Sequence, residues 1–321
     1  MNSLDSTYEI REYKWNIMLS KIASLILLVV TVLSNQVIAK DLEPRRWTPL
    51  PLGTSVVALG IGHTMGDLYF DPVMEVSDAE VEINTVVLAY IRSFSLADRL
   101  ARFDVRIPHQ SASWEGFLSG EPANIKRVGF SDPRFRLSIN LLGAPAVGST
   151  NMREYKVARP SNTIIGASIA VSVPWGEYFD DKLLNLGKNR YSIRPQIGAI
   201  HTDGLWSYEL TSSVFYFTDN KDFYADRKRG QKPLYATQAH LIRTFGPGLW
   251  GSLSAGYAWG GESKIDGIDK DDKRKDFLSA VSFGFPVSKT QSLKLSYVRG
   301  RTKNDVGVDT DSLVLAGSML F

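Results

Sequence analysis

The stretch SLVLAGSMLF, residues 312–321, decides the fold of this chain. Leu313, Leu315, Gly317, Met319 and Phe321 share one face of an extended strand, and small or uncharged side chains share the other. A strand in a barrel wall shows successive side chains to lipid and to lumen, so its sequence has a period of two rather than a continuous apolar run. The stretch therefore predicts an all-β transmembrane barrel closed by the C-terminal strand that ends in Phe321.

The other end of the chain has the features of an export signal. Lys21 precedes an apolar run over 22–33, and a small-residue cleavage site follows at 37–39. The run is shorter than the roughly 20 residues that a membrane-spanning helix needs. We therefore expect residues 1–39 to be a signal peptide rather than an uncleaved anchor, with Met18 as an alternative start of translation. An exported chain with barrel strands is expected in the bacterial outer membrane.

Composition limits the class of the mature chain. About 282 residues remain after the signal (321 minus 39), enough for one large all-β domain. The net charge of +3 is too mild to imply nucleic acid binding, and without cysteine there is no disulfide framework. Hydrophobic residues make up 44% of the chain, and the mean hydropathy is −0.11. These values exclude a helical membrane protein but fit a barrel, in which lumen positions dilute the apolar residues.

Segments of period-two alternation bounded by turn residues predict twelve strands of an antiparallel up-and-down barrel. Their expected limits are 53–65, 81–94, 100–112, 132–142, 162–174, 190–202, 205–218, 233–245, 248–260, 275–287, 291–303 and 309–321. An even number of strands brings both ends of the barrel to the periplasmic side. The barrel is therefore expected over 53–321. The preceding residues 40–52, which contain three prolines, either plug the barrel or lie in the periplasm.

The expected connections alternate in length. Those after the second, sixth, eighth and tenth strands are short, whereas others, such as 219–232 and 261–274, are longer and charged or rich in glycine. Short periplasmic turns with long outer loops are the usual asymmetry of a bacterial barrel. The connection 143–161 is long where a short turn is predicted. Either a strand limit is wrong there, or the periplasmic rim carries a small excursion.

The alternation also assigns faces to the side chains. Large apolar side chains such as Leu253 and Phe283 should meet lipid. The same parity turns charged and amide side chains to the lumen, because an Arg or Lys facing hydrocarbon at the midplane costs about 2 to 4 kcal/mol. The residues expected to line the lumen or the solute path are Arg102, Asp104, Arg106, Arg134, Arg136, Asn140, Arg194, Gln196, Glu209, Gln238 and His240. The strand over 81–94 stays ambiguous, since placing Tyr90 and Arg92 inward brings apolar neighbours inward too.

Two interpretations of this polar interior remain open. Five of its charged members are arginines and two, Asp104 and Glu209, are acids. In the first interpretation the charges form cross-strand ion pairs that fill a narrow barrel. In the second, the surplus of arginine lines a pore that favours anionic or carboxylated aromatic solutes. Both can hold at once.

Other kinds of site find little support in the sequence. The histidines form no i, i+4 pair, which argues against a metal centre. The loop 266–272 has carboxylates at a calcium-like spacing, but interleaved lysines would compete with a cation. No nucleophile elbow, phosphate loop or dinucleotide fingerprint is present. We expect no enzyme activity, cofactor or metal. The expected partners are outer-membrane lipid, the barrel-assembly machinery and a small-molecule solute, with no nucleic acid.

Several loop motifs are more specific than the strand alternation. They are EPRRWTPLPLGT (43–54), FDPV (70–73), GFSDPRFRL (129–137), GEYFDDKLLNLG (176–187), FTDN (217–220) and TDSL (310–313). In these motifs the chain resembles the outer-membrane family named after the MetA pathway of phenol degradation. The resemblance covers nearly all of the mature chain and implies a passive transporter, grouped with channels for aromatic or hydrophobic compounds. The rival class is a barrel that transports nothing, with a structural or surface-binding role and a lumen closed by ion pairs.

Overall fold

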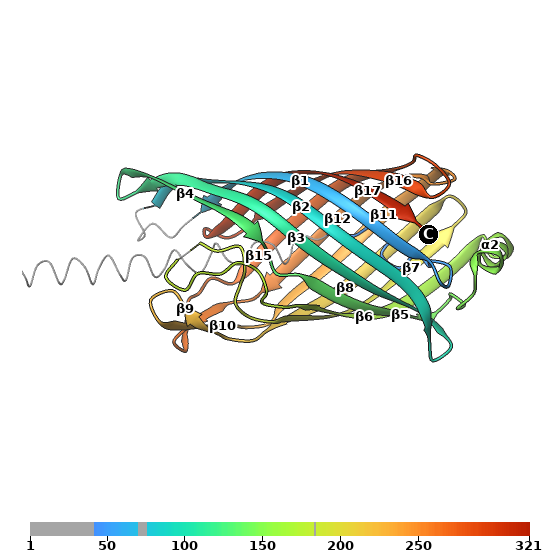
Figure 1. Cartoon of the computed structure of the whole chain (residues 1–321), viewed down its shortest axis with the longest axis horizontal. Helices are drawn as coiled ribbons and strands as arrows, with labels where there is room; N and C mark the ends of the chain where they lie inside the picture. Colours follow the sequence, from blue (N-terminus) through green and yellow to red (C-terminus); the bar gives the residue numbers. More distant parts are fainter. Residues whose placement is uncertain (1–41, 70–75, 183) are drawn as a thin grey trace, which may run out of the picture.

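The computed structural model describes residues 42–69, 76–182 and 184–321. The expected signal peptide, residues 1–39, lies outside the described residues. In the described part of the chain, no helix is long and apolar enough to cross a membrane. Most of this part is β-strand, and the strands form a tilted cylinder with the helix α2 (Ser149–Ala158) at one end (Figure 1).

Twelve antiparallel strands form a closed ring. The first strand pairs with both the second and the last, and pairing of β2 with β3 completes the ring. The strands of the ring are β1 (Ser55–Tyr69), β2 (Val76–Leu96), β3 (Arg99–Leu118), β5 (Arg134–Leu142), β6 (Ser161–Ser172), β7 (Ser192–Asp203), β8 (Trp206–Phe217), β11 (Leu234–Gly246), β12 (Leu249–Gly260), β15 (Arg274–Pro286), β16 (Gln291–Thr302) and β17 (Gly307–Leu320). The predicted barrel closed by the C-terminal strand is confirmed.

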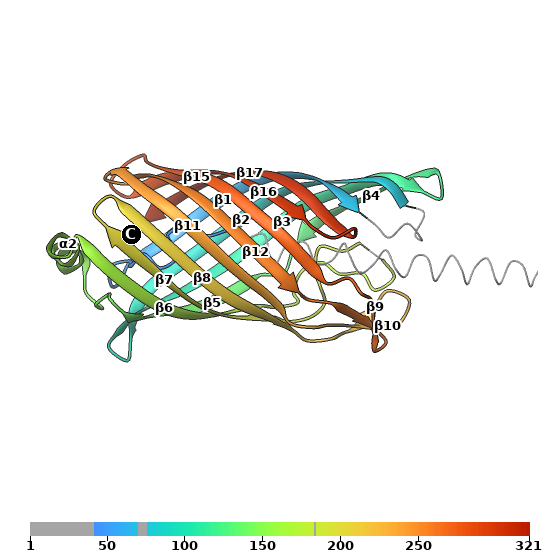
Figure 2. The same ribbon diagram turned by 180° about the vertical axis from the view of Figure 1, so that it is seen from behind.

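One face of each strand in the ring is apolar and exposed. On β12, for example, Leu253 is 59% exposed, whereas its neighbours Ser252 and Ser254 are buried. On β17, Leu313 and Leu315 are exposed in the same way. The strands on the far side of the cylinder, β8, β11, β12 and β15, run side by side in Figure 2. An apolar band around a closed barrel is the surface that a bilayer covers, so the protein is an outer-membrane β-barrel.

The strand that the alternation left ambiguous, β2, follows the same rule. Val86, Leu88 and Tyr90 are exposed on the outer face. Arg92 lies on this face as well, close to the end of the strand, where its Nη1 donates to Ser55 Oγ at 2.6 Å. A long cationic side chain near the membrane surface can reach polar groups, so its outward direction costs little there.

The sequence patterns do not predict β4 (Glu121–Phe130). This strand pairs with the outer part of β3, from His109 to Leu118, whereas β5 pairs with the part nearer the periplasm. The tight turn between β3 and β4 has two residues in the left-handed region, Ser119 (φ 52°) and Gly120 (φ 82°). In Figure 1 β4 projects beyond the other strands. Because no face needs to be apolar there, the alternation stops, and the expected limit 100–112 for the third strand is too short.

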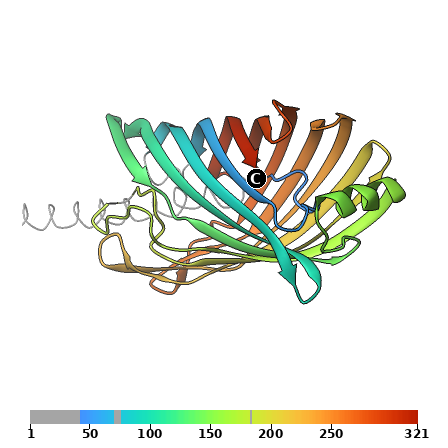
Figure 3. The same cartoon turned by 45° about the vertical axis from the view of Figure 1, so that its right-hand side comes forward.

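The long connection 143–161 holds the helix α2. The strands on either side, β5 and β6, keep to within two residues of their predicted limits. Met152 of the helix is buried, and Tyr155 donates its hydroxyl to the Gly143 carbonyl at 2.8 Å. The helix lies at the end of the barrel that also holds the C-terminus (Figure 3). Of the two alternatives for this connection, the excursion at the periplasmic rim is correct.

A small sheet stands at the opposite end of the barrel, where the sequence predicts only loops. Its strands are β9 (Asn220–Phe223), β10 (Arg227–Gln231), β13 (Ser263–Ile265) and β14 (Ile268–Asp269). Phe223 and Ile265 form its buried core. Asp269 of the calcium-like loop pairs with Lys232 at 2.7 Å and with Lys264 at 3.5 Å. One carboxylate of this loop is therefore paired with two lysines, Lys232 from outside the loop and Lys264 just before it.

Candidate functional site

The segment 42–54, which precedes β1, lies against the inner wall of the barrel. The backbone N–H of Glu43 donates to Gln238 Oε1 of β11 at 3.2 Å. The backbone N–H of Arg46 donates to Glu209 Oε1 of β8 at 2.9 Å. Both acceptors belong to the residues that the sequence assigns to the lumen. The segment therefore brings polar groups of its own into contact with the predicted set.

Glu43 is the meeting point of four guanidinium groups. Its Oε1 lies 2.8 Å from Arg106 Nη2 and 2.9 Å from Arg134 Nη2. Its Oε2 lies 2.6 Å from Arg136 Nη1 and 3.6 Å from Arg46 Nε. Charge-assisted hydrogen bonds of this kind are about twice as strong as neutral ones. One carboxylate that is not part of the wall thus holds together arginines from β3, β5 and its own segment.

A second carboxylate, Asp104 of β3, supports the same arginines from within the wall. Arg136 Nη2 lies 2.9 Å from Asp104 Oδ1, and Arg102 Nε lies 3.7 Å from Asp104 Oδ2. Arg102 also donates to the Arg46 carbonyl at 3.2 Å. Asp104 and Arg136 are 2% and 3% exposed. At this depth the loss of one charged partner is costly, because the other charge is left buried and unpaired.

Trp47, whose ring centroid lies 4.9 Å from the guanidinium carbon of Arg46, anchors the segment in the wall. Its Nε1 donates to Thr211 Oγ1 at 2.8 Å, and its ring is buried with Ile164 and other isoleucines of the wall. Two glycines make room for the indole: a Cβ at Gly166 would come within 2.4 Å of the ring, and one at Gly198 within 2.2 Å of Nε1. The wall is therefore shaped to accept this side chain.

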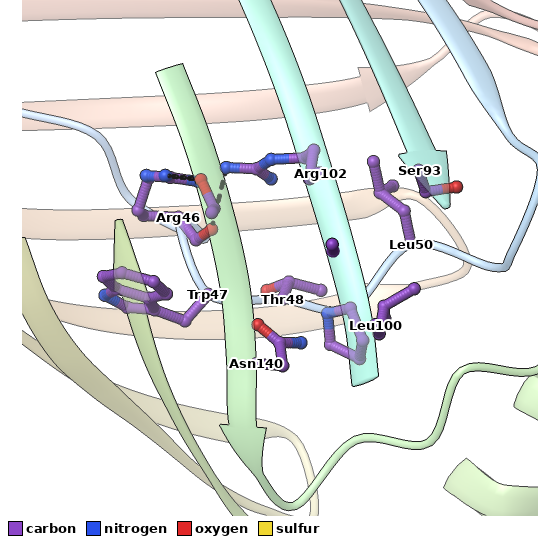
Figure 4. Close-up of a pocket in the computed structure, with 11 residues that line it drawn as sticks. Arg46, Trp47, Thr48, Leu50, Ser93, Leu100, Arg102 and Asn140 are labelled. Carbon is purple, nitrogen blue, oxygen red and sulfur yellow. Dashed lines mark hydrogen bonds between the residues drawn. The ribbon is translucent and has the colours of Figure 1, made fainter. Parts of the chain in front are cut away.

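A recess of about 290 Å³ lies between the segment and the strands β3 and β5. Arg46, Trp47 and Leu50 line it from the segment, and Arg102 and Asn140 line it from the wall (Figure 4). Arg46 reaches across it to donate to Ser138 Oγ. The recess joins polar and apolar surface, as small-molecule sites commonly do.

The sequence-predicted site residues fall into two groups in the structure. The first group contacts segment 42–54 or the arginines bound to it, or lines the recess; it consists of Arg102, Asp104, Arg106, Arg134, Arg136, Asn140, Glu209 and Gln238. The second group, Arg194, Gln196 and His240, also lies on the inner wall, and His240 is directly opposite Glu209. There Arg194 stands over the ring of Phe215 at 5.1 Å, and Gln196 accepts a hydrogen bond from Ser168 at 3.1 Å. His240 Nδ1 lies 2.7 Å from Ser254 Oγ.

Glu43, Arg46 and Trp47 are the functional candidates that the strand patterns miss. They precede the first strand, so no alternation assigns them a face. One signal does point to them: the predicted lumen has five arginines and two acids, so some counter-charge has to come from outside the strands. Glu43 supplies it.

Known proteins resemble the chain in sequence family and in fold. The chain matches the family described as "Putative MetA-pathway of phenol degradation" over residues 65–305. No curated protein sequence matches it. The COG4313 outer membrane channel from Pseudomonas putida F1 has a similar structure, with a TM-score of 0.74 and 22% identity over 88% of this chain and 100% of that chain. The transport unit of the autotransporter AIDA-I from Escherichia coli gives a TM-score of 0.51 and 9% identity over 93% of this chain and 98% of that chain.

At these identities the likeness to solved structures concerns the barrel fold alone. The family match rests on sequence and covers well over half of the chain. It also includes the strands β3, β5, β8 and β11, which carry the wall residues bound to segment 42–54. The chain therefore belongs to this phenol-degradation family.

Proposed function

We propose that the protein is an outer-membrane channel for small aromatic or hydrophobic compounds, including carboxylated ones. The observation that carries this proposal is the set of buried arginines on the inner wall, held by a carboxylate from outside the wall. Replacing buried ion pairs with apolar residues is often neutral or stabilising, so a barrel that only needed a filled interior could do without them. Charges kept inside a barrel favour a role in admitting and selecting solutes.

Charge and family support the class of solute. Among the described residues of the segment and of the wall around it, seven arginines face or enter the interior, against the three carboxylates of Glu43, Asp104 and Glu209; the arginines are Arg45, Arg46, Arg102, Arg106, Arg134, Arg136 and Arg194. An excess of guanidinium groups favours anions over cations. The family is described by a pathway of phenol degradation, and the similar structure from P. putida is described as a channel. Transport is passive in this proposal, down the gradient of the solute.

Residues 42–52 act as a plug that narrows the channel. The hydrogen bond of Trp47 to β8 and the ion pairs of Glu43 to β3 and β5 hold the segment against several strands of the wall. The recess beside it has a volume of only about 290 Å³. A solute therefore passes beside the segment or after the segment shifts. Weakening the Glu43 contacts should widen the path.

Single-channel recording in planar lipid bilayers tests this function. The wild-type barrel is expected to give small steps of conductance, and Glu43→Gln larger ones, because the amide cannot neutralise the arginines that hold the segment. Glu115→Gln is the matched control, since Glu115 is exposed on the outer part of β3 and only accepts a hydrogen bond from Asn124. It should conduct like the wild type.

A barrel that transports nothing is the second candidate. The fully buried Trp47 and the paired charges around it favour this alternative, because they fill much of the interior. Bilayers that contain intact barrels but give no steps, both for the wild type and for Glu43→Gln, would contradict the channel and support a structural role.

A further inference from the structure

A second group of cations lies towards the outer end of the barrel, beyond the ion pairs of Glu43. It consists of Lys188 and Arg190, in the connection 173–191 between β6 and β7, with Arg229 of β10 and Arg274 at the start of β15. We call these four residues the outer basic cluster. β10 and the start of β15 lie at the end opposite the helix α2 (Figure 1).

Arg190 is the most informative member of this cluster. It is 3% exposed, and its Nη2 donates to Gln231 Oε1. Its guanidinium stands over the ring of Phe217, 4.7 Å from the ring centroid. Among the described residues, its Nη1 is buried and has no hydrogen-bond partner. A buried donor on a charged group without an acceptor is costly, and a bound acceptor would remove that cost.

The acids around the cluster are already engaged. Asp132, between β4 and β5, accepts the backbone N–H groups of Gly176 and Lys188, each at 3.1 Å. Arg274 Nε donates to Asp276 at 2.7 Å. Asp219, which also acts on Arg190, pairs with Lys228 at 2.7 Å. The acids that act on Lys188 and Arg190 are therefore Asp132 and Asp219, both already engaged, whereas the cations Arg229 and Arg274 act on Lys188 from the other side of the balance.

The electrostatics of Lys188 reflect these charges. Burial, with the charges of Arg190, Arg274 and Arg229, lowers the pKa of the Lys188 ammonium to about 7, although Asp132 acts in the opposite direction. Burial and the charge of Arg229 also lower the pKa of Arg190. An anion placed among these groups would raise the pKa of Lys188, so its binding would be coupled to uptake of a proton.

Aromatic rings accompany the cations. Phe217 lies under Arg190, and Phe223 lies under Arg229 with the ring centroid 5.5 Å from the guanidinium carbon. Tyr178 accepts a hydrogen bond from Asn220 at 2.8 Å, which ties the connection 173–191 to β9. The cluster therefore offers cationic donors beside flat apolar surfaces, on a part of the chain that is held in place.

We propose that the outer basic cluster binds the carboxylate of a small aromatic acid as it enters from outside the cell. Arg190 Nη1 donates to the carboxylate, the Lys188 ammonium neutralises its charge, and Phe217 beside Arg190 contacts the aromatic ring of the solute. This inference rests on the proposed channel function and names its substrate class. It also assigns a selecting role to residues that the strand patterns do not single out.

Fluorine NMR titration of the full-length barrel in detergent micelles, with 4-fluorobenzoate as the probe, tests the inference. Arg190→Gln should weaken binding about tenfold or more, since a hydrogen bond between charged groups is lost. Lys188→Gln should weaken binding at pH 6.5, and it should remove the loss of affinity that the wild type shows between pH 7 and pH 9. Lys289→Gln, at an exposed lysine in the turn between β15 and β16, is the control and should bind normally.

Two further probes decide the class of ligand. The neutral analogue 4-fluorobenzyl alcohol should bind much more weakly than 4-fluorobenzoate and be indifferent to Arg190→Gln. Equal binding of the alcohol would overturn the carboxylate role, and displacement of the benzoate by an equal concentration of inorganic phosphate would overturn the aromatic class. The migration of the unheated barrel on a gel checks that each variant is folded.

Binding and conductance separate this inference from the proposed function. Carboxylate binding that depends on Arg190, in a barrel without conductance, would support the site and reject the channel. Conductance without measurable binding of 4-fluorobenzoate would keep the channel and overturn the site.

Discussion

The two arginine clusters of the barrel differ in what neutralises them. Around segment 42–54, the guanidinium groups converge on Glu43 at 2.6 to 3.6 Å, and Asp104 supports them from the wall. Arg46 and Arg102 also keep a buried Nε without a hydrogen bond, but these atoms lie 3.6 Å and 3.7 Å from a carboxylate oxygen. In the outer basic cluster, Asp132 accepts backbone N–H groups, and Arg190 keeps a buried Nη1 without a hydrogen-bond partner among the described residues. The comparison teaches that arginine is structural where the chain supplies the counter-charge, and is left to bind a ligand where it does not.

The largest effect on stability is expected from breaking the ion pairs around Glu43. Glu43→Gln leaves several buried guanidinium groups without their shared carboxylate, so the free energy of unfolding should fall by about 3 to 5 kcal/mol. Urea unfolding in lipid vesicles, followed by tryptophan fluorescence, measures this. Glu115→Gln serves as the control. A loss below about 1 kcal/mol would mean that the arginines find other partners and that Glu43 is not their organiser.

Removing the apolar anchor should have a slightly smaller effect. Trp47→Ala empties the space between Gly166 and Gly198 and removes the hydrogen bond to Thr211, at a cost of about 3 kcal/mol. The same unfolding experiment applies. Trp175→Ala is the control, because that ring is 69% exposed and should contribute little. If both variants unfold alike, segment 42–54 is not held by its tryptophan.

One arginine from each cluster sharpens the contrast. Arg134→Ala removes a 2.9 Å ion pair with Glu43 and should lower the free energy of unfolding by about 2 kcal/mol. Arg190→Gln should change the free energy of unfolding much less. Removing a buried, incompletely paired charge is favourable, and this gain offsets the packing that is lost. Urea midpoints of the two variants, compared with the wild type, check this order. Equal losses would remove the distinction between the clusters.

Ion selectivity offers a related measurement on the inner wall. Arg194 stands over Phe215 on the inner wall. If it lines the path of the solute, Arg194→Ala should shift the reversal potential in a salt gradient towards cations, with little loss of stability. An unchanged reversal potential would limit Arg194 to packing against the ring.

The smallest effect is a pH dependence that belongs to the outer basic cluster. The pKa of Lys188, about 7 in the folded chain, lies below its usual value of 10.5, so between these values the unfolded chain binds more protons. The free energy of unfolding should therefore rise with pH through this window. In Lys188→Gln the rise should be smaller, and the difference between the two urea series isolates the contribution of this residue. If the free energy of unfolding rises equally with pH in the wild type and in Lys188→Gln, the pKa of Lys188 is not lowered.

Sequence predicts the membrane part of the fold well because lipid imposes a rule on it. The strand expected over 248–260 is β12 (Leu249–Gly260), and its faces alternate as the sequence suggests. Outside the bilayer, strands do not need one apolar face, so the alternation is absent. For that reason β4, the outer sheet and the full lengths of β2 and β3 are missed, since their side chains face water on both sides or pack on local partners.

The sequence predicts the wall residues of the candidate site, but it does not predict that segment 42–54 binds them. The parity of β3 and β5 directs Arg102, Arg106 and Arg136 inward, as expected. Glu43 lies 93 positions before Arg136, in a segment without strand periodicity, and no local pattern connects the two. The interpretation of cross-strand ion pairs is therefore right for Asp104 and Arg136 and incomplete for the others, whose counter-charge comes from segment 42–54.

The docking of segment 42–54 has a consequence for the order of folding. Its hydrogen bonds to Glu209, Thr211 and Gln238 join positions 163 to 195 apart in the chain. Contacts of such long separation form late, because the loop entropy must be lost before they can stabilise the fold. The earliest residues of the described chain can reach their final places only once β8 and β11 stand in the wall. A buried Trp47 is thus a reporter of assembly, and the time course of its fluorescence would record when the interior of the barrel is complete.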